Sequence, residues 1–340
     1  STTLRWRVDV PLDAPATDYG VIAQASWLGG RTQGYGSSAV PAPLTATLTP
    51  PVVQVDAGAS GRSTLRVTSA AGAPVRVSWQ ATPPAGSGVT VIPASGSFTV
   101  PAGRTSTAAL TATAGPNPGA TAVPITLTAT GVGHTVPLST ATLSVSVPYP
   151  NFPAAYGNIA ITDDSDINPS GLNGGIDGDG SSLSAQQLAG IGITPGGTVS
   201  HGGFTFGWPA SASGQPDNVL ADGQTIELTG SGHALGLLTT GTYSPPAGTV
   251  TVTYTDGTTA TATISDPDWQ AAPPSGSNVA ITTTYHNYTG SGRVNRNAYL
   301  YLHTVTLDPT KTVASVTLPT IGDHTTGGTP ALHVFGLAIA

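Results

Sequence analysis

Short runs of alternating apolar and polar residues recur throughout residues 44–147, and this pattern limits the possible folds more than any other feature of the chain. Roughly six or seven such runs follow one another at intervals of about 8–15 residues, and glycine and proline separate them. Because successive side chains of a strand point to opposite faces of a sheet, the alternation predicts strands that bury one face. The spacing predicts an immunoglobulin-like (Ig-like) β-sandwich of about 100 residues, with Trp79 in its core.

The second half of the chain predicts another sandwich, with about ten strand-like runs after residue 150. One short helix is predicted at 184–190, because Ser184 lies three residues before Gln187, which is the spacing of a capping box. A Rossmann fold or a TIM barrel would need repeated helices, which the sequence does not predict. The predicted fold class is therefore all-β, with one or more Ig-like β-sandwiches followed by a larger jelly-roll-type β-sandwich.

The predicted domain boundaries follow the proline-rich junction VPYPNFPAAYGN and the change of composition beyond it. We predict an Ig-like sandwich over 44–149 and a jelly-roll-type module over 150–340. Residues 1–43 contain two strand-like runs, at 4–10 and 20–28. A lone hairpin is marginally stable in water, so these runs are interpreted as the closing strands of a partial Ig-like domain, or as strands that pack on the next domain. Because the chain does not begin with Met, we expect it to be a processed or excised piece of a longer protein.

Charge is divided unevenly along the chain. Residues 1–150 carry a net charge of +3, whereas residues 151–340 contain thirteen acidic and three basic residues, a net charge of −10. The acidic half argues against nucleic acid and anionic membranes as partners, and it favours neutral ligands and cations. The chain has no cysteine, which excludes disulfides and thiolate metal sites. No apolar run approaches the roughly 20 residues of a membrane span.

Several separated motifs of the second half resemble a known module. NIAITDDSD, SAQQLAGIGITPGGTV, GFTFGWP and LHVFGLAIA occur in this order between residues 156 and 340. They resemble a C-terminal β-sandwich module of secreted actinobacterial glycoside hydrolases, such as α-mannosidases, α-galactosidases and rhamnosidases. Residues 2–28 and 44–147 resemble the Ig-like linker domains beside such modules. The resemblance implies a secreted accessory region that binds carbohydrate, with the catalytic domain elsewhere in the parent enzyme. The chain departs from the module at IDGDGSSLS, where relatives tend to have a tyrosine in FDGGGYSYS.

Residues 161–180 form an acidic, glycine-rich segment that holds five of the sixteen aspartates of the chain. Calcium binds carboxylate, carbonyl and water oxygens, and a flexible loop can fold such groups around one point, so calcium is the predicted cofactor. The spacing is not that of an EF-hand, because Pro169 stands where the glycine would be. A solvated loop, in which aspartates cap their own backbone, explains the same residues without a metal. The candidate metal ligands are Asp163, Asp164, Asp166, Asp177 and Asp179.

Catalysis by this chain is the least favoured interpretation. A glycosidase needs two facing carboxylates, and with Glu227 as the only glutamate the pair would have to be two aspartates. Asp217, Asp266 and Asp268 are the candidates, and Asp217 lies in a QPDNV segment that is typical of a turn. The sequence has neither a GxSxG nucleophile motif nor an HExxH zinc motif. We therefore predict no catalytic residues in this chain.

The segment TTTYHNYTGSGRVNRNAYLYLH, residues 282–303, is the densest aromatic and polar stretch of the chain. Sugar binding uses aromatic faces and planar polar groups, and the middle of this segment predicts a loop between two strands, where binding residues are common. Two alternatives stay open: the tyrosines point inward on strands, and the two arginines pair with the acidic loop. Trp208 and Trp269 are further candidates that packing would also explain. The candidate ligand-binding residues are Tyr285, His286, Asn287, Tyr288, Arg293, Asn295, Arg296, Trp208 and Trp269.

The sequence thus predicts a non-catalytic accessory region of a secreted glycoside hydrolase, whose C-terminal module binds a polysaccharide or glycan and has a calcium-organised loop. Its other predicted partner is the catalytic domain of the parent enzyme. The alternative is that both sandwiches are structural spacers or packing surfaces for that domain. A stand-alone hydrolase that uses an aspartate pair is the third hypothesis.

Overall fold

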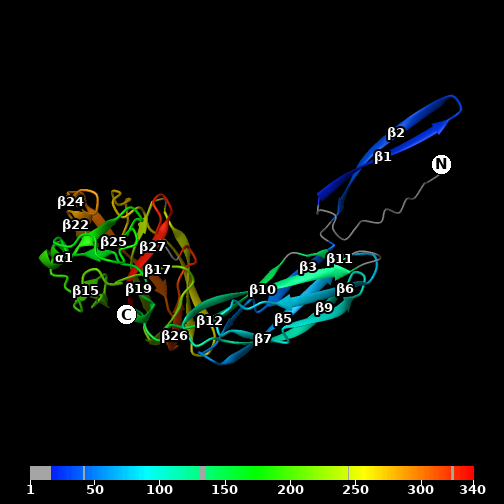
Figure 1. Cartoon of the computed structure of the whole chain (residues 1–340). Helices are drawn as coiled ribbons and strands as arrows, with labels where there is room; N and C mark the ends of the chain where they lie inside the picture. The colour runs from blue at the N-terminus through cyan, green and yellow to red at the C-terminus, as the bar shows by residue number, and fades with distance from the viewer. Residues whose placement is uncertain (1–16, 41–42, 131–134, 139, 244, 323–324) are drawn as a thin grey trace. The chain divides into compact units, whose positions relative to one another are not determined.

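The computed structural model describes residues 17–40, 43–130, 135–138, 140–243, 245–322 and 325–340, and they form an almost entirely β structure (Figure 1). The chain divides into two compact units, Ser1–Val147 and Pro148–Ala340. Each unit has its own buried apolar core. The predicted all-β sandwich class is confirmed. No helix in the described part of the chain is long and apolar enough to cross a membrane.

The first described element is an antiparallel hairpin of β1 (Thr17–Trp27) and β2 (Gly30–Val40). Trp27 pairs with Gly30 around a two-residue turn, in which Gly29 has a positive φ of 104° that glycine adopts without steric cost. All of the predicted run at 20–28 except Leu28 lies in β1, whereas the run at 4–10 lies outside the described residues. No sequence pattern predicted β2, because its sequence GRTQGYGSSAV has little apolar alternation.

The smaller sandwich has two sheets around one core. Leu65 and Val67 point into the core from one strand, while Arg66 and Thr68 between and after them are exposed, as alternation predicts. Trp79 is 4% exposed and lies in this core, as predicted. One sheet has the strand order β4 (Val52–Gln54), β12 (Ala141–Val147), β10 (Gly119–Thr130), β6 (Val75–Ala81), β8 (Ser95–Val100). A short strand, β11 (Thr135–Pro137), also pairs with β10. The other sheet has the order β3 (Leu44–Thr49), β5 (Ser60–Ser69), β9 (Thr105–Thr113), β7 (Thr90–Ile92).

The second unit is built on a larger sandwich. A first core between its two main sheets contains Leu237, Val252 and Val316. The five-stranded sheet has the order β17 (Val219–Leu220), β27 (Ala331–Ile339), β19 (Ala234–Thr242), β25 (Ala298–Thr306), β22 (Val279–Thr283); the four-stranded sheet has the order β18 (Thr225–Gly230), β26 (Val313–Thr317), β20 (Ala247–Tyr254), β21 (Thr259–Ser265). A 3-10 turn, η1 (Pro153–Ala155), precedes them in the chain.

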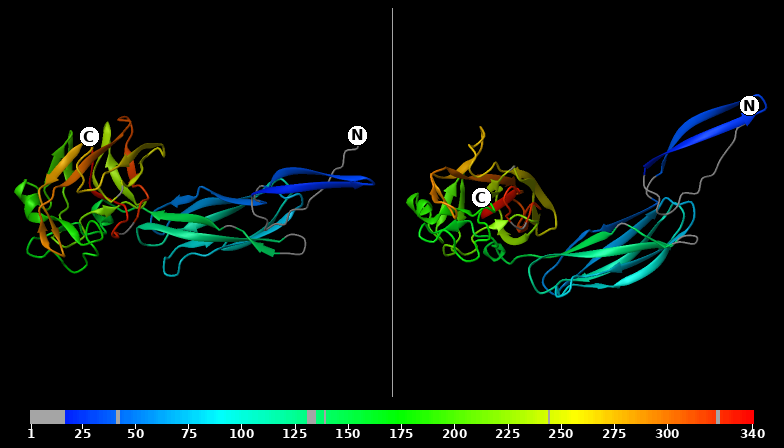
Figure 2. Two further views of the ribbon diagram at one scale, coloured as in Figure 1. Left: turned by 90° about the horizontal axis from the view of Figure 1, so that it is seen from above. Right: turned by 45° about the horizontal axis from the view of Figure 1, so that its top comes forward.

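A third layer covers the outer face of the five-stranded sheet. The strand β19 is buried continuously from Leu235 to Thr242, which shows that both of its faces are covered. Leu238, Leu300 and Phe335 belong to a second core on this side. In Figure 1 α1, β15 and β24 lie to the left of β27, and in both views of Figure 2 the green segment with α1 lies to the left of the red C-terminal strand. It consists of α1 (Ala185–Gly190), the hairpin β15 (Thr198–His201)–β16 (Phe204–Gly207), and a small sheet in the order β13 (Ile161–Thr162), β14 (Ser181–Ser184), β23 (His286–Tyr288), β24 (Gly292–Val294).

The helix α1 begins as its sequence predicts. Ser184 is the N-cap, and its Oγ accepts a hydrogen bond from the backbone N–H of Gln187 at 3.0 Å. The predicted range 184–190 therefore matches the N-cap and the helix that follows it.

A buried polar network ties the third layer to the main sheet. The Asp217 carboxylate accepts hydrogen bonds from the backbone N–H groups of Ala160 at 3.0 Å and Ile161 at 2.9 Å, and from the Asn218 amide at 2.8 Å. Asn218 Oδ1 in turn accepts from Nδ1 of His333 on β27 at 2.9 Å. Burial raises the pKa of Asp217 to about 7 and lowers the pKa of His333 to about 3. His333 is therefore neutral in the folded protein at neutral pH.

The lowered pKa of His333 predicts a specific pH dependence of stability. The unfolded chain binds a proton at this residue below its ordinary pKa of about 6.5, whereas the native state does not, so stability is lost as the pH falls from 6.5 towards 3. Asp217 contributes in the opposite sense, because its raised pKa lets the native state bind the extra proton. The free energy of unfolding, measured with urea, should fall between pH 7 and pH 5 by about 2 kcal/mol less in His333→Gln than in the wild type. Equal losses in the two proteins would contradict this account.

Candidate functional site

The acidic segment 161–180 and the aromatic segment 282–303 lie against each other in the small sheet of the third layer. The strand β14 pairs in parallel with β13 and antiparallel with β23, with Leu183 opposite His286. The strand β23 continues into the β23–β24 hairpin, which carries the predicted binding loop. Two regions that the sequence analysis treated as separate candidate sites therefore belong to one structure.

Asp164 is the centre of the contact between the two segments. One oxygen of its carboxylate accepts hydrogen bonds from the Ser184 hydroxyl at 2.5 Å and the Asn287 amide at 3.1 Å. The other oxygen accepts from the Tyr285 hydroxyl at 2.8 Å. Three protein donors thus satisfy this carboxylate, and one of them is the side chain that caps α1. Hydrogen bonds to an ionised acceptor are stronger than neutral ones, so Asp164 fixes the position of the Tyr285 ring.

Arg293 lies on the ring that Asp164 holds. Its guanidinium carbon is 3.7 Å from the centroid of the Tyr285 ring, and its Nε donates a hydrogen bond to Asn295 Oδ1 at 2.9 Å. Asp164, Tyr285 and Arg293 therefore form a stack in which each group orients the next. We call this stack, together with Asn295, the arginine platform. Arg293 and Asn295 are exposed, so the outer end of the platform faces solvent.

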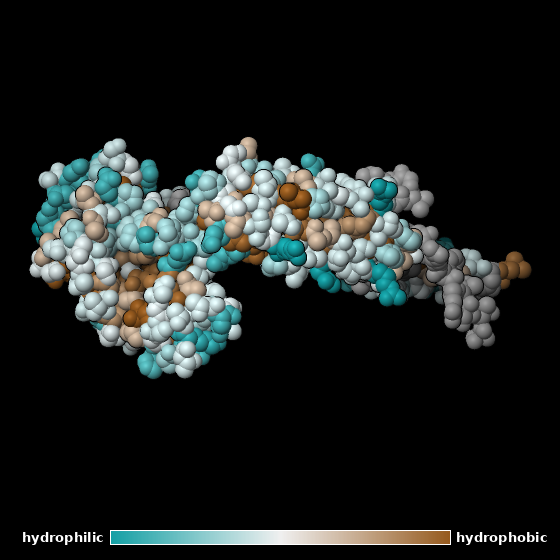
Figure 3. Space-filling view, turned by 90° about the horizontal axis from the view of Figure 1, so that it is seen from below, coloured by the Kyte–Doolittle hydropathy of each residue, from teal (hydrophilic) through white to brown (hydrophobic). Residues whose placement is uncertain are grey.

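The alternative that the arginines pair with the acidic loop is not what the structure shows. Among the described residues, neither Arg293 nor Arg296 makes an ion pair with an aspartate or glutamate. Arg293, Asn295 and Arg296 are exposed, so the platform belongs to the surface of the second unit. Seen from below, hydrophilic residues gather at the left end of the space-filling view (Figure 3).

Other predicted ligand-binding residues are inside the fold. His286 and Asn287 on β23 are buried, and Asn287 also donates to the backbone carbonyl of Thr162 at 3.3 Å. The His286 ring meets the Trp269 ring edge-on, with 4.9 Å between centroids, and burial lowers the pKa of His286. These side chains hold the small sheet on the main sheet and do not reach solvent.

Both predicted tryptophan platforms are packing residues, which is the alternative that the sequence left open. Trp208 is 4% exposed and stacks on Phe335 with 5.7 Å between ring centroids, and Trp269 is 2% exposed. Tyr288 is partly exposed, and its ring lies over Gly290, where an added Cβ would lie only 2.7 Å from it. The solvent-accessible candidates that remain from the predicted set are Tyr288, Arg293, Asn295 and Arg296.

The first three aspartates of the acidic loop have different roles. The Asp163 carboxylate accepts from the backbone N–H of Ser165 at 2.8 Å and from the Gln186 amide at 2.7 Å. The hydrogen bonds from Ser165 and Gln186 lower the pKa of Asp163. Asp164 belongs to the arginine platform. Asp166 is exposed, and its carboxylate makes no hydrogen bond to any other described residue.

The last two aspartates belong to a second group around Tyr243. Asp177 accepts from the backbone N–H groups of Asp179 at 3.0 Å and Ser181 at 3.1 Å, as in the self-capping loop that the sequence left open. The Tyr243 hydroxyl contacts Asp179 Oδ2 at 2.6 Å, and Tyr243 has the rare positive φ of 62°. The sequence analysis missed Tyr243, because the contact spans 64 residues and has no local signal.

The described residues contain no group of three or more His, Cys, Asp or Glu side chains arranged to hold a metal ion. Calcium remains a prediction from the sequence, and the hydrogen bonds above provide another means of fixing the loop.

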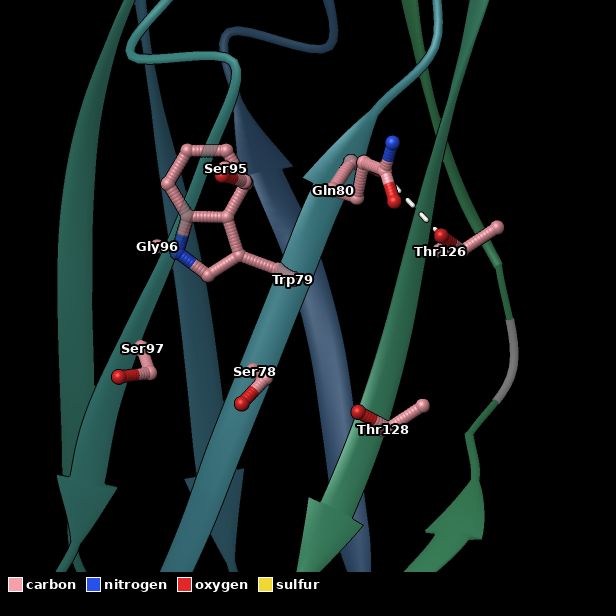
Figure 4. A pocket seen from close by; sticks show the side chains of 8 residues that line it. All are labelled: Ser78, Trp79, Gln80, Ser95, Gly96, Ser97, Thr126 and Thr128. Atoms are coloured by element: carbon pink, nitrogen blue, oxygen red, sulfur yellow. Dashed lines mark hydrogen bonds between the residues drawn. The ribbon is translucent and has the colours of Figure 1, made fainter.

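Two shallow hollows lie on the surface of the units. One, of about 630 Å³, follows the acidic loop and Thr289, next to the β23–β24 turn. The loop can double back there because Gly174 has no side chain: an added Cβ would lie 2.7 Å from the backbone of Gly178. The other hollow, of about 410 Å³, lies in the smaller sandwich (Figure 4). It is lined by Ser78, Trp79, Gln80, Ser95, Gly96, Ser97, Thr126 and Thr128.

A protein-family model described as an AziU2-like beta-sandwich domain matches residues 167–323. The match lies within the second unit and includes the arginines of the candidate site. No curated protein matches the chain.

Solved structures resemble the chain only weakly. WR4, a C. elegans MSP family member, is 15% identical over 30% of this chain and 96% of its own, with a TM-score of 0.23. The native conformation of E. coli alpha-2-macroglobulin is 16% identical over 68% of this chain and 11% of its own, with a TM-score of 0.29. A family 123 glycoside hydrolase from Clostridium perfringens is 12% identical over 35% of this chain and 30% of its own, with a TM-score of 0.24. Similarity at this level supports no conclusion about function.

The hydrogen bonds of the acidic loop predict how the protein responds to a chelator. Four of the five carboxylates already accept hydrogen bonds from the protein, so we expect excess EDTA to leave the melting temperature unchanged relative to excess calcium chloride. Asp166→Asn is the matched control and should melt like the wild type, since this carboxylate has no donor in the described part of the chain. A melting temperature that falls with EDTA in the wild type would favour the predicted calcium site instead, because a ligand of the native state must raise stability.

Proposed function

We propose that the chain is a non-catalytic accessory region of a secreted glycoside hydrolase, and that its second unit binds a glycan at the arginine platform. One observation carries the proposal: the Arg293 guanidinium is fixed on the Tyr285 ring, bonded to Asn295, and exposed without an acidic partner among the described residues. The hollow along the acidic loop lies at the other end of β23 and offers further polar contacts.

The geometry of the platform suits recognition of a polar, weakly binding ligand. A guanidinium has five N–H donors in one plane, and only the Nε donor of Arg293 bonds to another described residue. The stacking and the hydrogen bond to Asn295 order the side chain before any ligand arrives, which reduces the entropy lost on binding. Sugar rings present several oxygens close together, so a planar donor set held in place is a suitable partner for them.

The aspartates that could form a catalytic pair have structural partners, which supports a non-catalytic role. Asp217 is 2% exposed and anchors two backbone N–H groups. Asp266 is fully buried beside His303, with 2.5 Å between carboxylate oxygen and Nε2. Asp268 accepts from the backbone N–H groups of Tyr243 and Gln270 at 2.7 and 3.0 Å. A glycosidase pair must instead face a bound sugar from both sides.

A purely structural role is the second candidate, and the buried tryptophans favour it. Trp208 and Trp269, the two indoles of the second unit, lie in its core, where they offer no aromatic face to a sugar. A spacer that supports a catalytic domain elsewhere in the parent protein would need no exposed ligand site.

Binding measurements on the whole chain separate the two roles. We expect the wild type to bind members of a broad glycan array, and Arg293→Ala to lose at least about tenfold in affinity, as truncating a central arginine contact typically does. Arg66→Ala, which removes an exposed arginine of the smaller sandwich, is the control and should bind like the wild type. If Arg293→Ala binds as well as the wild type, the site is elsewhere; if the wild type binds no glycan, the structural role is correct.

A further inference from the structure

The second unit has few cations, and its two arginines are not used to balance its acids. Of the three basic residues after position 150, Lys311 pairs with Asp256 at 3.0 Å. Arg293 and Arg296 lie three residues apart on and after β24, and no described carboxylate pairs with either. In a unit with thirteen acidic residues, two exposed arginines that are three residues apart, and that pair with no described carboxylate, mark the place where an anion is best accepted.

The arginines of the platform surface present free hydrogen-bond donors, whereas its exposed carboxylate, Asp164, already accepts three hydrogen bonds from the protein. Asn295 Oδ1 is occupied by the Nε–H of Arg293, which leaves the Asn295 amide N–H groups free to donate outward. The terminal nitrogens of Arg293 make no hydrogen bond to any other described residue. Arg296 adds further donors and has no acceptor to offer. These free donors match a group that only accepts.

A carboxylate is such a group, and a sugar hydroxyl is not. Hydroxyls both donate and accept, so protein sites for neutral sugars need acceptors as well as donors. A carboxylate offers two coplanar oxygens that match the two terminal nitrogens of a guanidinium, which gives a bidentate, charge-assisted pair. The Tyr285 ring under Arg293 and the bond to Asn295 hold the guanidinium in one plane for this contact.

We propose that the glycan bound at the arginine platform carries a carboxylate, as in a terminal glucuronic or galacturonic acid, which Arg293 and Asn295 hold and Arg296 supports. This inference rests on the proposed glycan-binding function. The net charge of −10 on residues 151–340 sets a further limit, because it repels densely charged polymers at long range. The ligand class is therefore an otherwise neutral glycan with an isolated uronic acid, and not a polyanion.

Pairs of sugars that differ only in the carboxyl group test the carboxylate assignment directly. The probes are glucuronosyl- and galacturonosyl-terminated oligosaccharides, and the same compounds with the carboxyl group reduced to a primary alcohol. We expect calorimetric titration of the whole chain to show at least about tenfold tighter binding of the acid form, because the reduced form cannot make a charge-assisted bidentate pair with the guanidinium. Arg293→Gln, which keeps an amide donor, should abolish most of this preference, whereas Lys311→Gln should keep it. The affinity for the acid form should also fall as salt rises.

The outcomes distinguish this inference from the proposed function. Equal binding of acid and reduced forms would overturn the carboxylate assignment and leave glycan binding intact. Tighter binding of a heavily sulfated or polyuronic polymer than of the single-acid probes would overturn the limit to isolated charges. If none of these sugars binds and the broad array is also negative, both proposals fail.

Discussion

Burial of the five-stranded sheet on both faces is the constraint on which the second unit depends. Its strand β19 is buried from Leu235 to Thr242, so the outer face as well as the sandwich face must be covered. The cover consists of segments that are far apart in the chain, from 161–207 and 286–294. Once β14 and β23 pair within that cover, the acidic loop and the aromatic hairpin must lie together. The candidate site is thus a consequence of completing a core.

Within that cover, the hydrogen bonds of Asp164 fix side chains that support an exposed surface. Its carboxylate joins the cap of α1 through Ser184 to the ring of Tyr285, and the ring supports Arg293. The buried side chains of Ser184 and Asn287 hold the Asp164 end of this stack, and the guanidinium at its other end is exposed. The exposed end has hydrogen-bond donors and positive charge, and its side chains have little conformational freedom. A ligand-binding surface benefits from this combination, whereas a spacer does not need it.

Sequence patterns predicted the local features and missed the long-range ones. Alternation identified the strands of the smaller sandwich and the core position of Trp79, and cap spacing placed α1 at Ser184. The polar, glycine-rich β2 was missed, because alternation carries no signal there. The bond between Asp164 and Tyr285 spans 121 residues, so no local pattern could separate hydrogen-bonded aspartates from metal ligands. Likewise, exposed aromatic platforms and buried ones look alike in sequence, as Trp208 and Trp269 show.

The central claim is that Asp164 and Tyr285 act as one unit beneath Arg293, and a double-mutant cycle in urea unfolding tests it most directly. The cycle compares Asp164→Asn, Tyr285→Phe and the double variant with the wild type. We predict a coupling free energy of about 1 kcal/mol or more, because each single substitution already breaks the same charged hydrogen bond. Effects that add to within about 0.3 kcal/mol would show that the two side chains act independently and would contradict the account.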